Sequence, residues 1–463
     1  MSVARTNTLP DGVLIGWYGD DFTGSAAVME VLSFAGLPSV LFLDVPTDEQ
    51  IARFPDVRAI GIAGTSRSRT PEWMQKNLPP IFDYLKTLDA PVVHYKICST
   101  LDSSPEIGSI GQAIDLAQPV FQSEWVPLLL AAPAIRRYQS FGHLFAAAAD
   151  GVYRLDRHPV MTCHPVTPMA ESDVARHLSA QTDREIGLID LEMIAGTQAI
   201  SSMLMANGIV TSMDTVSQND LTRVGQLIWE NKRDGIFAVG SQGVEYALVS
   251  HWVDANYLVA QQAPDSAGQV DRIIVVSGSV SLITATQIDW ALKNGFVGIA
   301  LDAPVLLAGE DSIAAEVKRI LALATTAIKD GKDPLIYAAK GPDDPAVQAF
   351  SRAVSNSGIS VDEANNLIGA TLGAILDRLL RQSGVRRAVI SGGDTSGHAT
   401  RQLEIFALTA LAPTVPGAAL FQVHSQNPQY QNLQLALKGG QMGTPDYFGW
   451  IKQGGGAAGK GEL

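Results

Sequence analysis

The fold is decided by residues 15–25, which read IGWYGDDFTGS. An apolar run of the kind that forms a buried strand leads into this stretch. Behind it, apolar residues recur every three or four positions between 28 and 35, which is the spacing of one helix face. Gly36 is suited to end that helix, and a second apolar run, 39–43, follows at once. Residues 13–43 therefore predict a β-α-β unit.

Two adjacent carboxylates, Asp20 and Asp21, stand where the predicted strand becomes a helix. Ligands of open α/β sheets bind beyond the carboxyl ends of the strands, which is where this pair falls. The alternative is that one aspartate only caps the helix while the other faces solvent. A cap needs one aspartate, whereas this pair lies between glycines. The pattern favours a site for a hydroxylated or metal-bound ligand.

Composition sets the broad class of the protein. The chain has 463 residues, of which 46% are hydrophobic and 17% charged, and this length predicts two or three domains. The formal net charge is −14, and no basic stripe is present to neutralise phosphates, which argues against nucleic acid as a partner. An anionic small ligand would therefore need a local cluster of Arg and Lys.

The cysteines and the N-terminus indicate a cytoplasmic, reducing location. Cys98 and Cys163 cannot form a disulfide framework and lack the spacing of a metal site. No charged segment followed by an apolar one opens the chain, and 18 uninterrupted apolar residues occur nowhere. We therefore expect no membrane partner.

Polar groups also follow the next two predicted strands. The run 57–63 ends in a loop that carries Ser66 and Arg67, and an arginine suits bidentate binding of a carboxylate or phosphate. The run 91–97 contains Lys96, whose ammonium needs a partner inside an apolar strand. We expect five charged residues to converge at one sheet edge: Asp20, Asp21, Arg67, Lys96 and Asp102. Ser66 and Ser99 are further substrate-binding candidates. This mixture suits a small acid with several hydroxyls.

Strand, glycine turn and helix recur along the chain, which predicts α/β domains with mostly parallel sheets flanked by helices. A polar segment with Pro and Gly interrupts the pattern, so we predict an N-terminal domain over 1–251, a linker over 252–270 and a C-terminal domain over 271–451. Residues 452–463 are expected to be a flexible tail. That tail matches G-x-x-x-x-G-K but lacks the Ser or Thr and the flanking elements of a phosphate loop.

Three small-residue turns in the second half predict phosphate binding. The first two, 277–281 and 391–397, each stand between a strand and a helix, and the helices are predicted over 284–293 and 399–411. Such turns expose backbone N–H groups at a helix N-terminus, where anions bind. The third turn, 438–443, adds a lysine beside glycines. One such turn is weak support for a phosphate site, but three in one domain favour it.

These motifs, in this order, resemble the four-carbon acid sugar kinase family. The resemblance rests on Gly19-Asp20-Asp21-Phe22-Thr23-Gly24, Thr65-Ser66-Arg67, Lys96 with Ser99-Thr100, Ser277-Gly278-Ser279, Ser391-Gly392-Gly393-Asp394-Thr395 and Lys438-Gly439-Gly440 with Gly443. It extends from about Val13 to Trp450. It implies an ATP-dependent kinase of threonate, erythronate or oxo-tetronate type, with an N-terminal sugar-acid domain and a C-terminal nucleotide domain.

The resemblance divides the site residues between two substrates. Asp20, Asp21, Arg67 and Lys96 belong to the acid-sugar side. The ATP side comprises Ser277, Gly278, Ser279, Gly392, Gly393, Asp394, Thr395, Lys438, Gly439, Gly440, Gln441 and Gly443. The chain departs from the family where Asp102 stands in place of a common basic residue, and around residues 136–143.

Phosphoryl transfer depends on positioning and charge neutralisation, so turn amides and Lys438 are expected to hold the phosphates, which Mg²⁺ bridges. Asp21, with Asp20 as second choice, is predicted to take the proton of the acceptor hydroxyl. Asp394 is the candidate ligand of Mg²⁺ or its waters. Arg67 or Lys96 would bind the substrate carboxylate. The reaction is expected in a cleft between the domains, which closes to exclude water.

Two other functions stay open at this point. One is a different α/β enzyme acting on hydroxy acids, which is disfavoured because no G-x-G-x-x-G motif with a later acidic residue follows the strands. The other is a non-catalytic sugar-acid sensor, although no basic DNA-reading segment is present. The stereoisomer of the acid, the hydroxyl that is phosphorylated and a possible homodimer are not determined by the sequence.

Overall fold

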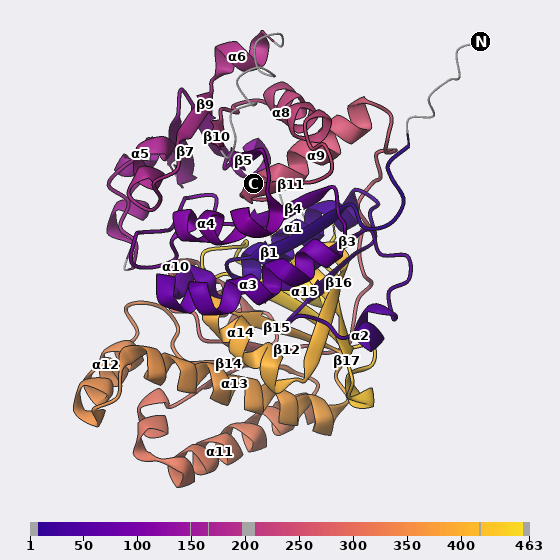
Figure 1. Cartoon of the computed structure of the whole chain (residues 1–463). Helices are drawn as coiled ribbons and strands as arrows, with labels where there is room; N and C mark the ends of the chain where they lie inside the picture. Colours follow the sequence, from indigo (N-terminus) through magenta and orange to yellow (C-terminus); the bar gives the residue numbers. More distant parts are fainter. Residues whose placement is uncertain (1–7, 149, 165, 197–208, 416–417, 457–463) are drawn as a thin grey trace. The chain divides into compact units, whose positions relative to one another are not determined.

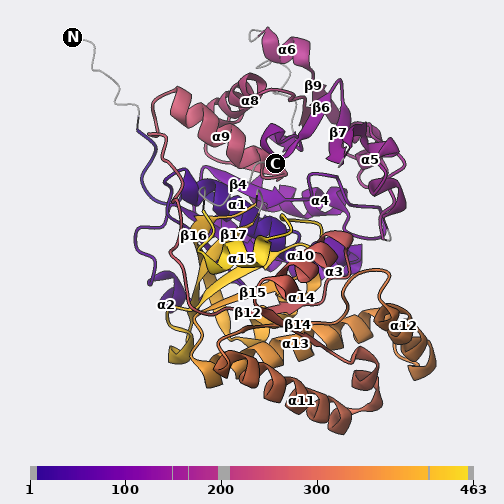
Figure 2. The ribbon, with the colours of Figure 1, turned by 180° about the vertical axis from the view of Figure 1, so that it is seen from behind.

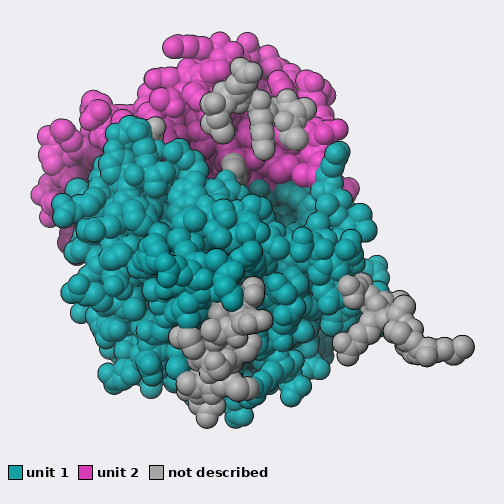
Figure 3. Space-filling model, turned by 90° about the horizontal axis from the view of Figure 1, so that it is seen from above, with its two compact units in different colours: residues 1–262 teal, residues 263–463 magenta. Residues whose placement is uncertain are grey.

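The computed structural model describes residues 8–148, 150–164, 166–196, 209–415 and 418–456, except for the side chain of Asp394. The chain divides into two compact units, residues 1–262 and 263–463, which are coloured separately in Figure 3. Within the described ranges, no helix is both long and apolar enough to cross a membrane.

Unit 1 contains a parallel sheet, as the repeated strand, turn and helix pattern predicts. Its strands lie in the order β2 (Ser39–Phe42), β3 (Ala59–Ala63), β1 (Ile15–Gly19), β4 (Val92–Lys96), β11 (Ile236–Gly240), β5 (Trp125–Leu129), β10 (Ile209–Met213) and β9 (Ile186–Ile189), and every neighbouring pair is parallel. The strands are apolar runs because helices cover both faces. The first strand begins at Ile15 and runs to Gly19, later than the predicted run that starts at Val13.

Helices pack on both sides of this sheet (Figure 1). The helices of unit 1 are α1 (Phe22–Phe34), α2 (Asp48–Ile51), α3 (Pro71–Thr87), α4 (Ile110–Phe121), α5 (Val174–Ser179), α6 (Leu191–Ala195), α8 (Gln218–Glu230) and α9 (Gly243–Asp254). The contacts of α3 with α4, of α1 with α9 and of α8 with α9 divide the main helices into two layers. Gly36, with a φ of 91°, follows α1 in the left-handed conformation that favours glycine.

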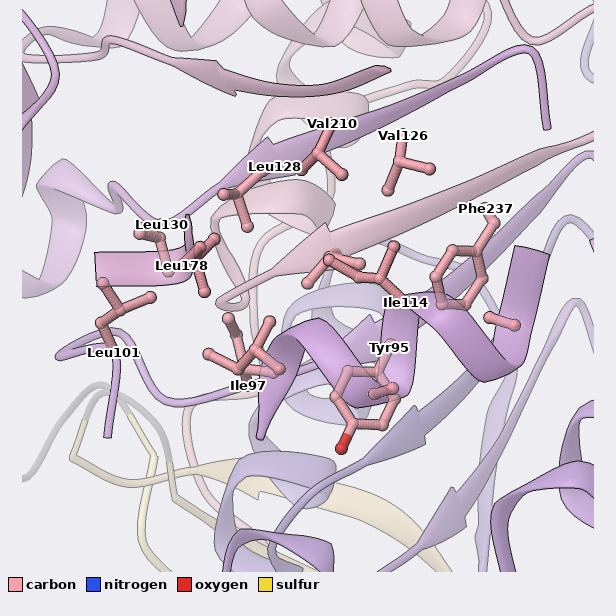
Figure 4. Close-up of a cluster of buried hydrophobic side chains, with 14 of the residues drawn as sticks. Tyr95, Ile97, Leu101, Ile114, Val126, Leu128, Leu130, Leu178, Val210 and Phe237 are labelled. Atoms are coloured by element: carbon pink, nitrogen blue, oxygen red, sulfur yellow. The ribbon is translucent and has the colours of Figure 1, made fainter. Parts of the chain in front are cut away.

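The larger core of unit 1 lies beneath α3 and α4. Figure 4 shows side chains of this core, among them Tyr95 and Ile97, and Phe237 beside Ile114 of α4. Tyr95 is 1% exposed and Phe237 is fully buried. The residues of this core come from strands far apart in the sequence, so burial of their apolar surface fixes the order of the strands.

A small antiparallel sheet branches from unit 1 and was not predicted. It consists of β6 (Arg137–Ser140), β7 (His143–Ala148) and β8 (Gly151–Arg154). Its first strand follows β5 through a short 3-10 turn, Pro133–Ile135. Its alternation of apolar and polar residues is too brief to give a clear strand signal.

Unit 2 contains a mixed sheet. The strands lie in the order β13 (Phe296–Ala300), β14 (Asp333–Tyr337), β12 (Ile274–Ser277), β15 (Arg387–Ser391), β18 (Gln434–Lys438), β17 (Ala419–Ser425) and β16 (Ile405–Pro413). The pairs up to β18 are parallel, and β17 is antiparallel to both of its neighbours. Both units therefore have α/β folds with mostly parallel sheets, which confirms the predicted fold class.

Helices cover both faces of this sheet as well. They are α10 (Leu282–Lys293), α11 (Glu310–Lys329), α12 (Pro345–Ser357), α13 (Val361–Ser383), α14 (Gly393–Gln402) and α15 (Tyr447–Lys452). The long helices α11 and α13 lie side by side in both ribbon views (Figures 1 and 2). The pair α10 and α15 packs on the core that contains Val275, Val389 and Trp450.

Two local predictions were wrong. The helix predicted over 399–411 ends at Gln402, and residues 405–411 belong to strand β16. The apolar run there suits either element, and pairing with β17 decides for the strand. The predicted linker begins inside helix α9, which runs to Asp254.

The described part of the predicted tail is folded. Gly454, Gly455 and Gly456 are buried, and the Gly456 amide donates to the Pro413 carbonyl at 2.7 Å. The end of the predicted linker pairs with this segment, since the Ala267 amide donates to Gly454 O at 2.9 Å. Residues 457–463 lie outside the described residues. The glycines resemble a flexible tail in composition, but here they allow close backbone contact.

Candidate functional site

The first candidate site stands at the carboxyl edge of the unit 1 sheet. Register places Gly19, Lys96 and Gly240 side by side at the ends of β1, β4 and β11. Asp20 directly follows Gly19, and its amide donates to the Lys96 carbonyl at 2.9 Å. Arg67 arrives from the turn after β3, with its amide on the Asp20 carbonyl at 2.9 Å. The backbone alone thus brings these three residues together.

Arg67 joins the two aspartates through its guanidinium. Its Nε donates to Asp20 Oδ2 at 3.1 Å, and its Nη2 lies 2.6 Å from Asp20 Oδ1. The same Nη2 lies 2.7 Å from Asp21 Oδ1. The Asp20 side chain is 3% exposed, whereas those of Asp21 and Arg67 are 23% and 24% exposed. Asp20 therefore anchors the arginine, and Asp21 presents the more accessible carboxylate.

Asp21 also caps helix α1, as the alternative interpretation of the pair predicts, but Asp20 is buried and does not face solvent. Asp21 Oδ1 accepts from the Gly24 amide at 3.0 Å, and Oδ2 accepts from Thr23 Oγ1 at 2.6 Å. A Cβ on Gly24 would lie 3.0 Å from Lys96 Nζ, so that ammonium is close to the same cap. Lys96 is 2% exposed, and its Nζ donates to the Ile97 carbonyl at 2.6 Å.

The electrostatics of the two aspartates differ. Burial raises the pKa of Asp20, and this effect exceeds the opposing effect of Arg67. Burial also acts to raise the pKa of Asp21, but the charges of Arg67 and Lys96 outweigh it and lower that pKa. Arg67 stays a cation because the two carboxylates raise its pKa against the effect of burial. The cluster thus holds two carboxylates and two cations in a partly desolvated space.

The remaining predicted residues of this side lie near the cluster, with different roles. Ser66 is fully buried and its hydroxyl lies 2.9 Å from Tyr95 OH, so it belongs to the core beneath the site. Ser99 is partly exposed in the turn after β4. Asp102 Oδ1 accepts from Thr100 Oγ1 at 2.8 Å in the same turn. Burial raises the pKa of the neighbouring Cys98 thiol to about 11, so this thiol is neutral at physiological pH.

A buried pair, formed by His94 on the strand of Lys96 and by Glu245, was missed in the sequence. His94, two residues earlier on β4, has its Nδ1 2.6 Å from Glu245 Oε1, and both side chains are fully buried. Its Nε2 lies 3.1 Å from the Gly240 carbonyl, which also accepts from the Ile97 amide at 2.7 Å. Because 151 residues separate the pair, no local pattern could have indicated it.

The second candidate site stands at the carboxyl edge of the unit 2 sheet. Register aligns Ser277, Ser391 and Lys438, the last residues of β12, β15 and β18. All three are fully buried. The two serine hydroxyls have no hydrogen-bond partner among the described atoms. Unpartnered buried hydroxyls beside a lysine are suited to an anion, because an unpaired polar group is otherwise unfavourable there.

Lys438 lies among hydroxyls and carbonyls. Its Nζ lies 2.9 Å from the Gly439 carbonyl and 3.3 Å from Thr284 Oγ1. Burial lowers the pKa of Lys438 to about 8. Thr284 Oγ1 in turn lies 3.0 Å from Ser279 Oγ and donates to the Gly440 carbonyl at 3.1 Å. These contacts join the first and third predicted turns.

Glycine is required where the turns approach one another. A Cβ on Gly278 would overlap Thr395 Oγ1, and one on Gly440 would lie 2.5 Å from Ser279 Oγ. Gly392 has a φ of 121° and stands at the N-terminus of α14, with its amide on the Lys438 carbonyl at 2.9 Å. The structure therefore joins all three predicted turns into one cradle.

The other residues predicted for the ATP side flank this cradle. Gly393 is exposed at the first turn of α14, and Thr395 is 7% exposed behind it. Gln441 is exposed, and Gly443 follows in a left-handed conformation with a φ of 95°. The side chain of Asp394, the predicted metal ligand, lies outside the described part of the structure. No group of three or more potential metal-binding side chains occurs among the described residues.

Two family models match the chain. The model described as a sugar-binding N-terminal domain matches residues 15–248. The model described as a nucleotide-binding C-terminal domain matches residues 274–448. Each match contains one of the two clusters described above.

Curated relatives match almost the whole chain. A 3-oxo-isoapionate kinase from Paraburkholderia graminis is 43% identical over 96% of this chain and 95% of that protein. A 3-oxo-tetronate kinase from Pseudomonas savastanoi pv. phaseolicola is 30% identical over 96% of this chain and 98% of that protein. These relatives confirm the predicted enzyme class, a carbohydrate kinase.

Solved structures share the fold. A protein from Salmonella typhimurium LT2 matches with a TM-score of 0.76 at 24% identity, covering 95% of this chain and 98% of that chain. Haemophilus influenzae protein HI1011 matches with a TM-score of 0.70 at 22% identity, covering 94% and 99%. The family models and the curated relatives show that the chain belongs to the four-carbon acid sugar kinase family.

Proposed function

We propose that this protein is an ATP-dependent kinase that phosphorylates a hydroxyl of a small 3-oxo sugar acid. The proposed binding of ATP rests on the alignment of Ser277, Ser391 and Lys438 at one sheet edge. The proposed binding of the sugar acid rests on the cluster of Asp20, Asp21, Arg67 and Lys96.

The relatives narrow the choice of acid. Both of the curated relatives described above act on 3-oxo acids according to their names. The greater identity, 43% against 30%, favours 3-oxo-isoapionate over 3-oxo-tetronate. Threonate and erythronate, which the sequence motifs also suggest, are the acids to compare.

The residues of unit 2 fit the phosphates of ATP. The free hydroxyls of Ser277 and Ser391 can donate to phosphate oxygens, and the first amides of α14 face the same cradle. Phosphate raises the pKa of Lys438 and keeps its ammonium charged. ATP, when bound, supplies the phosphoryl group that is transferred. The glycines keep side chains out of the volume that the phosphates need.

Magnesium is the expected companion of ATP. Mg²⁺ bound to nucleotides usually takes one or two carboxylates, waters and phosphate oxygens, so it does not need a preformed cluster of side chains. Asp394, at the start of α14, remains the proposed ligand of the ion or its waters.

The acid-side residues divide the remaining tasks. Asp21 accepts the proton of the attacking hydroxyl, because it is ionised and is more exposed than Asp20. Its lowered pKa makes it a weak base, but a loose transition state needs little proton removal before the new bond forms. Asp20 fixes Arg67, and Arg67 and Lys96 neutralise the charge that gathers at the reacting oxygens. The meeting of acid and nucleotide in a cleft between the domains stays a prediction.

Coupled ADP release with MgATP over a panel of acids tests this proposal. The panel contains 3-oxo-isoapionate, 3-oxo-tetronate, and the D and L forms of threonate and erythronate. We expect turnover with a 3-oxo acid and weak turnover with the others. Two outcomes would contradict the acid assignment. One is ADP release that does not depend on any acid. The other is no ADP release with any acid while ATP still raises the thermal midpoint of the protein. The absence of any effect of ATP would contradict the kinase.

A further inference from the structure

Arg137 was not predicted as a site residue, although its place in the fold brings it to the acid-side edge. It is the first residue of β6, and its backbone pairs with Ala132 through N–H···O bonds of 3.0 and 3.2 Å. Ala132 lies just beyond the end of β5. Register aligns Leu129 at that end with Gly240, and Gly240 with Lys96. Arg137 therefore follows the same carboxyl edge of the sheet that carries Lys96.

The strand that carries Arg137 is firmly attached to unit 1. Gln139 and Thr215 exchange backbone hydrogen bonds of 3.0 and 2.9 Å. The Gln139 side chain donates to Ser212 Oγ at 2.7 Å, and Asp214 accepts from the Gly142 amide at 3.0 Å. Gln139 and Asp214 are fully buried. Such an anchored element can position a side chain for specific binding.

The Arg137 guanidinium has N–H donors that are not used in contacts with the described residues. Its Nη1 lies 3.2 Å from the carbonyls of Ile135 and Arg136 and 3.5 Å from that of Ala147. Its Nε is buried and has no hydrogen-bond partner in the described part of the chain. The guanidinium contacts given above are all made by Nη1. Nε and Nη2 form the edge of a guanidinium that binds a carboxylate through two parallel hydrogen bonds. The free edge is thus the one that carboxylate recognition uses.

Acidic groups of the neighbouring turn lie within electrostatic range of Arg137. Burial lowers the pKa of Arg137, and Cys98 and Asp102 act against this decrease, so both lie within electrostatic range of the guanidinium. Cys98 is also within range of Arg67. Two arginines are therefore within electrostatic range of Cys98 in the turn that follows β4.

The charge balance of the acid side leaves room for another cation. The formal charges of Asp20 and Asp21 are matched by those of Arg67 and Lys96. Arg67 already contacts both carboxylates, and Lys96 Nζ donates to a carbonyl. An incoming carboxylate would add an uncompensated negative charge, which is unfavourable in a partly buried site. A further guanidinium with a free edge can supply the missing partner.

We propose that Arg137 binds the carboxylate of the sugar acid through Nε and Nη2 and so selects acids over uncharged sugars. This inference rests on the proposed function, and it revises the expectation that Arg67 or Lys96 binds that carboxylate. Arg137 acts in specificity and takes no part in proton or phosphoryl transfer.

The test compares Arg137→Met with Arg136→Met, which removes an adjacent exposed arginine. The acid is 3-oxo-tetronate, and erythrulose is its uncharged counterpart, with CH₂OH in place of the carboxylate. We expect Arg137→Met to raise the KM for the acid at least tenfold, to leave kcat and the KM for ATP within threefold, and to leave the Ki of erythrulose unchanged. Arg136→Met should resemble the unmodified protein in every constant.

Equal changes for acid and erythrulose would show that Arg137 only maintains the local structure, and an unchanged KM for the acid would overturn the inference outright. If Arg137→Met does not fold, Arg137→Lys replaces it in the test. Lysine keeps the charge but lacks the two parallel N–H donors of the guanidinium, so the KM for the acid should rise several-fold in this variant. Calorimetric binding of the acid replaces KM if turnover is absent, and unchanged affinity in the variant then counts against Arg137. Turnover with an unaffected Arg137→Met variant refutes this inference alone, whereas no turnover with any acid refutes the proposed function.

Discussion

The two strand-edge clusters share a plan and differ in charge. Lys96 and Lys438 are each the last residue of a parallel strand, each is buried, and each Nζ donates to the carbonyl of the next residue. Lys96 lies close to a carboxylate pair that Arg67 also joins. Around Lys438, the described side chains supply hydroxyls, and burial alone lowers its pKa.

This difference indicates what each cluster lacks. The acid-side cluster is close to neutral, so it can orient hydroxyls without a strong demand for an anion. The cradle in unit 2 contains a desolvated cation and two unpartnered hydroxyls, so an anion stabilises it. The same position in the two sheets is thus suited to two kinds of ligand, because the neighbouring turns carry different side chains.

The largest effect is expected from Asp21→Asn. Asparagine caps a helix about as well as aspartate, so the fold should be retained. Loss of the carboxylate should lower kcat by about 10²- to 10⁴-fold, the usual range for a general base. The ATP-induced rise in thermal midpoint should not change. Asp44→Asn, which alters an exposed carboxylate after β2, is the control. Normal turnover in Asp21→Asn would remove this residue from the proposed role.

Exchange of the two lysines for methionine should change stability in opposite directions. Lys438→Met removes a buried cation without a carboxylate partner, so the free protein should gain about 1 kcal/mol. Lys96→Met leaves the aspartate pair with one cation fewer and should lose about 3 kcal/mol. Urea unfolding without ligands measures both changes. If both substitutions changed the free energy of unfolding in the same direction, the two clusters would not differ in the way described.

Lys438→Met should also raise the KM for ATP by about 100-fold, in the range expected for loss of charged hydrogen bonds to phosphate. The KM for the acid should change little, because the acid-side residues are in the other unit. A change confined to the acid would reverse the assignment of the two clusters.

The affinity for ATP should depend on pH in the alkaline range. The pKa of Lys438 in the folded protein is about 8, below the ordinary value of 10.5. Below pH 8 the lysine is charged and binds phosphate; above pH 8 binding requires proton uptake, so affinity should fall by up to about tenfold per pH unit. The stability of the free protein should rise between pH 8 and 10.5, since only the unfolded chain then holds the proton. Calorimetry measures the affinity for ATP, and unfolding curves measure the stability, both over pH 7–10. Lys438→Met is the control, in which neither quantity should show this dependence on pH.

The acid limb of kcat/KM can separate the two aspartates. The pKa of Asp21 is lowered, so a base at this position stays ionised as the pH falls to its ordinary value of 3.8 and below. The pKa of Asp20 is raised, so a base there would be lost above 3.8. With Asp21 as the base, we expect no acid limb above pH 3.8 other than that of the substrates. A limb that disappears in Asp20→Asn would favour Asp20.

The smallest effect is expected from glycine substitution in the cradle. A Cβ in Gly278→Ala would overlap Thr395 Oγ1, so the turn must shift at a cost of about 1–3 kcal/mol. We expect a several-fold increase in the KM for ATP. Gly397→Ala is the control, because no atom lies within 4 Å of the Cβ position there. Identical behaviour of the two variants would show that the cradle tolerates movement.

The sequence by itself determined the local units. Strand, glycine turn and helix around residues 15–36 follow from apolar spacing, from Asp21 as cap and from Gly36 as terminator, because these depend on neighbours within a few positions. The same local patterns indicated both clusters, and the resemblance of the motifs to a known family implied the class of enzyme. Where local patterns suit two elements, prediction failed: residues 405–411 became a strand only by pairing with β17.

Tertiary structure decided what the local units became together. Arg67 meets Asp20 across 47 residues, and His94 meets Glu245 across 151. The alignment of Ser277 and Ser391 with Lys438, and the arrival of Arg137 at the acid-side edge, depend on strand order and register. Strand order is set by burial of apolar surface shared among distant segments, which leaves no local trace in the sequence. The sequence thus determined which residues stand at the strand ends, and packing decided which of them face one another.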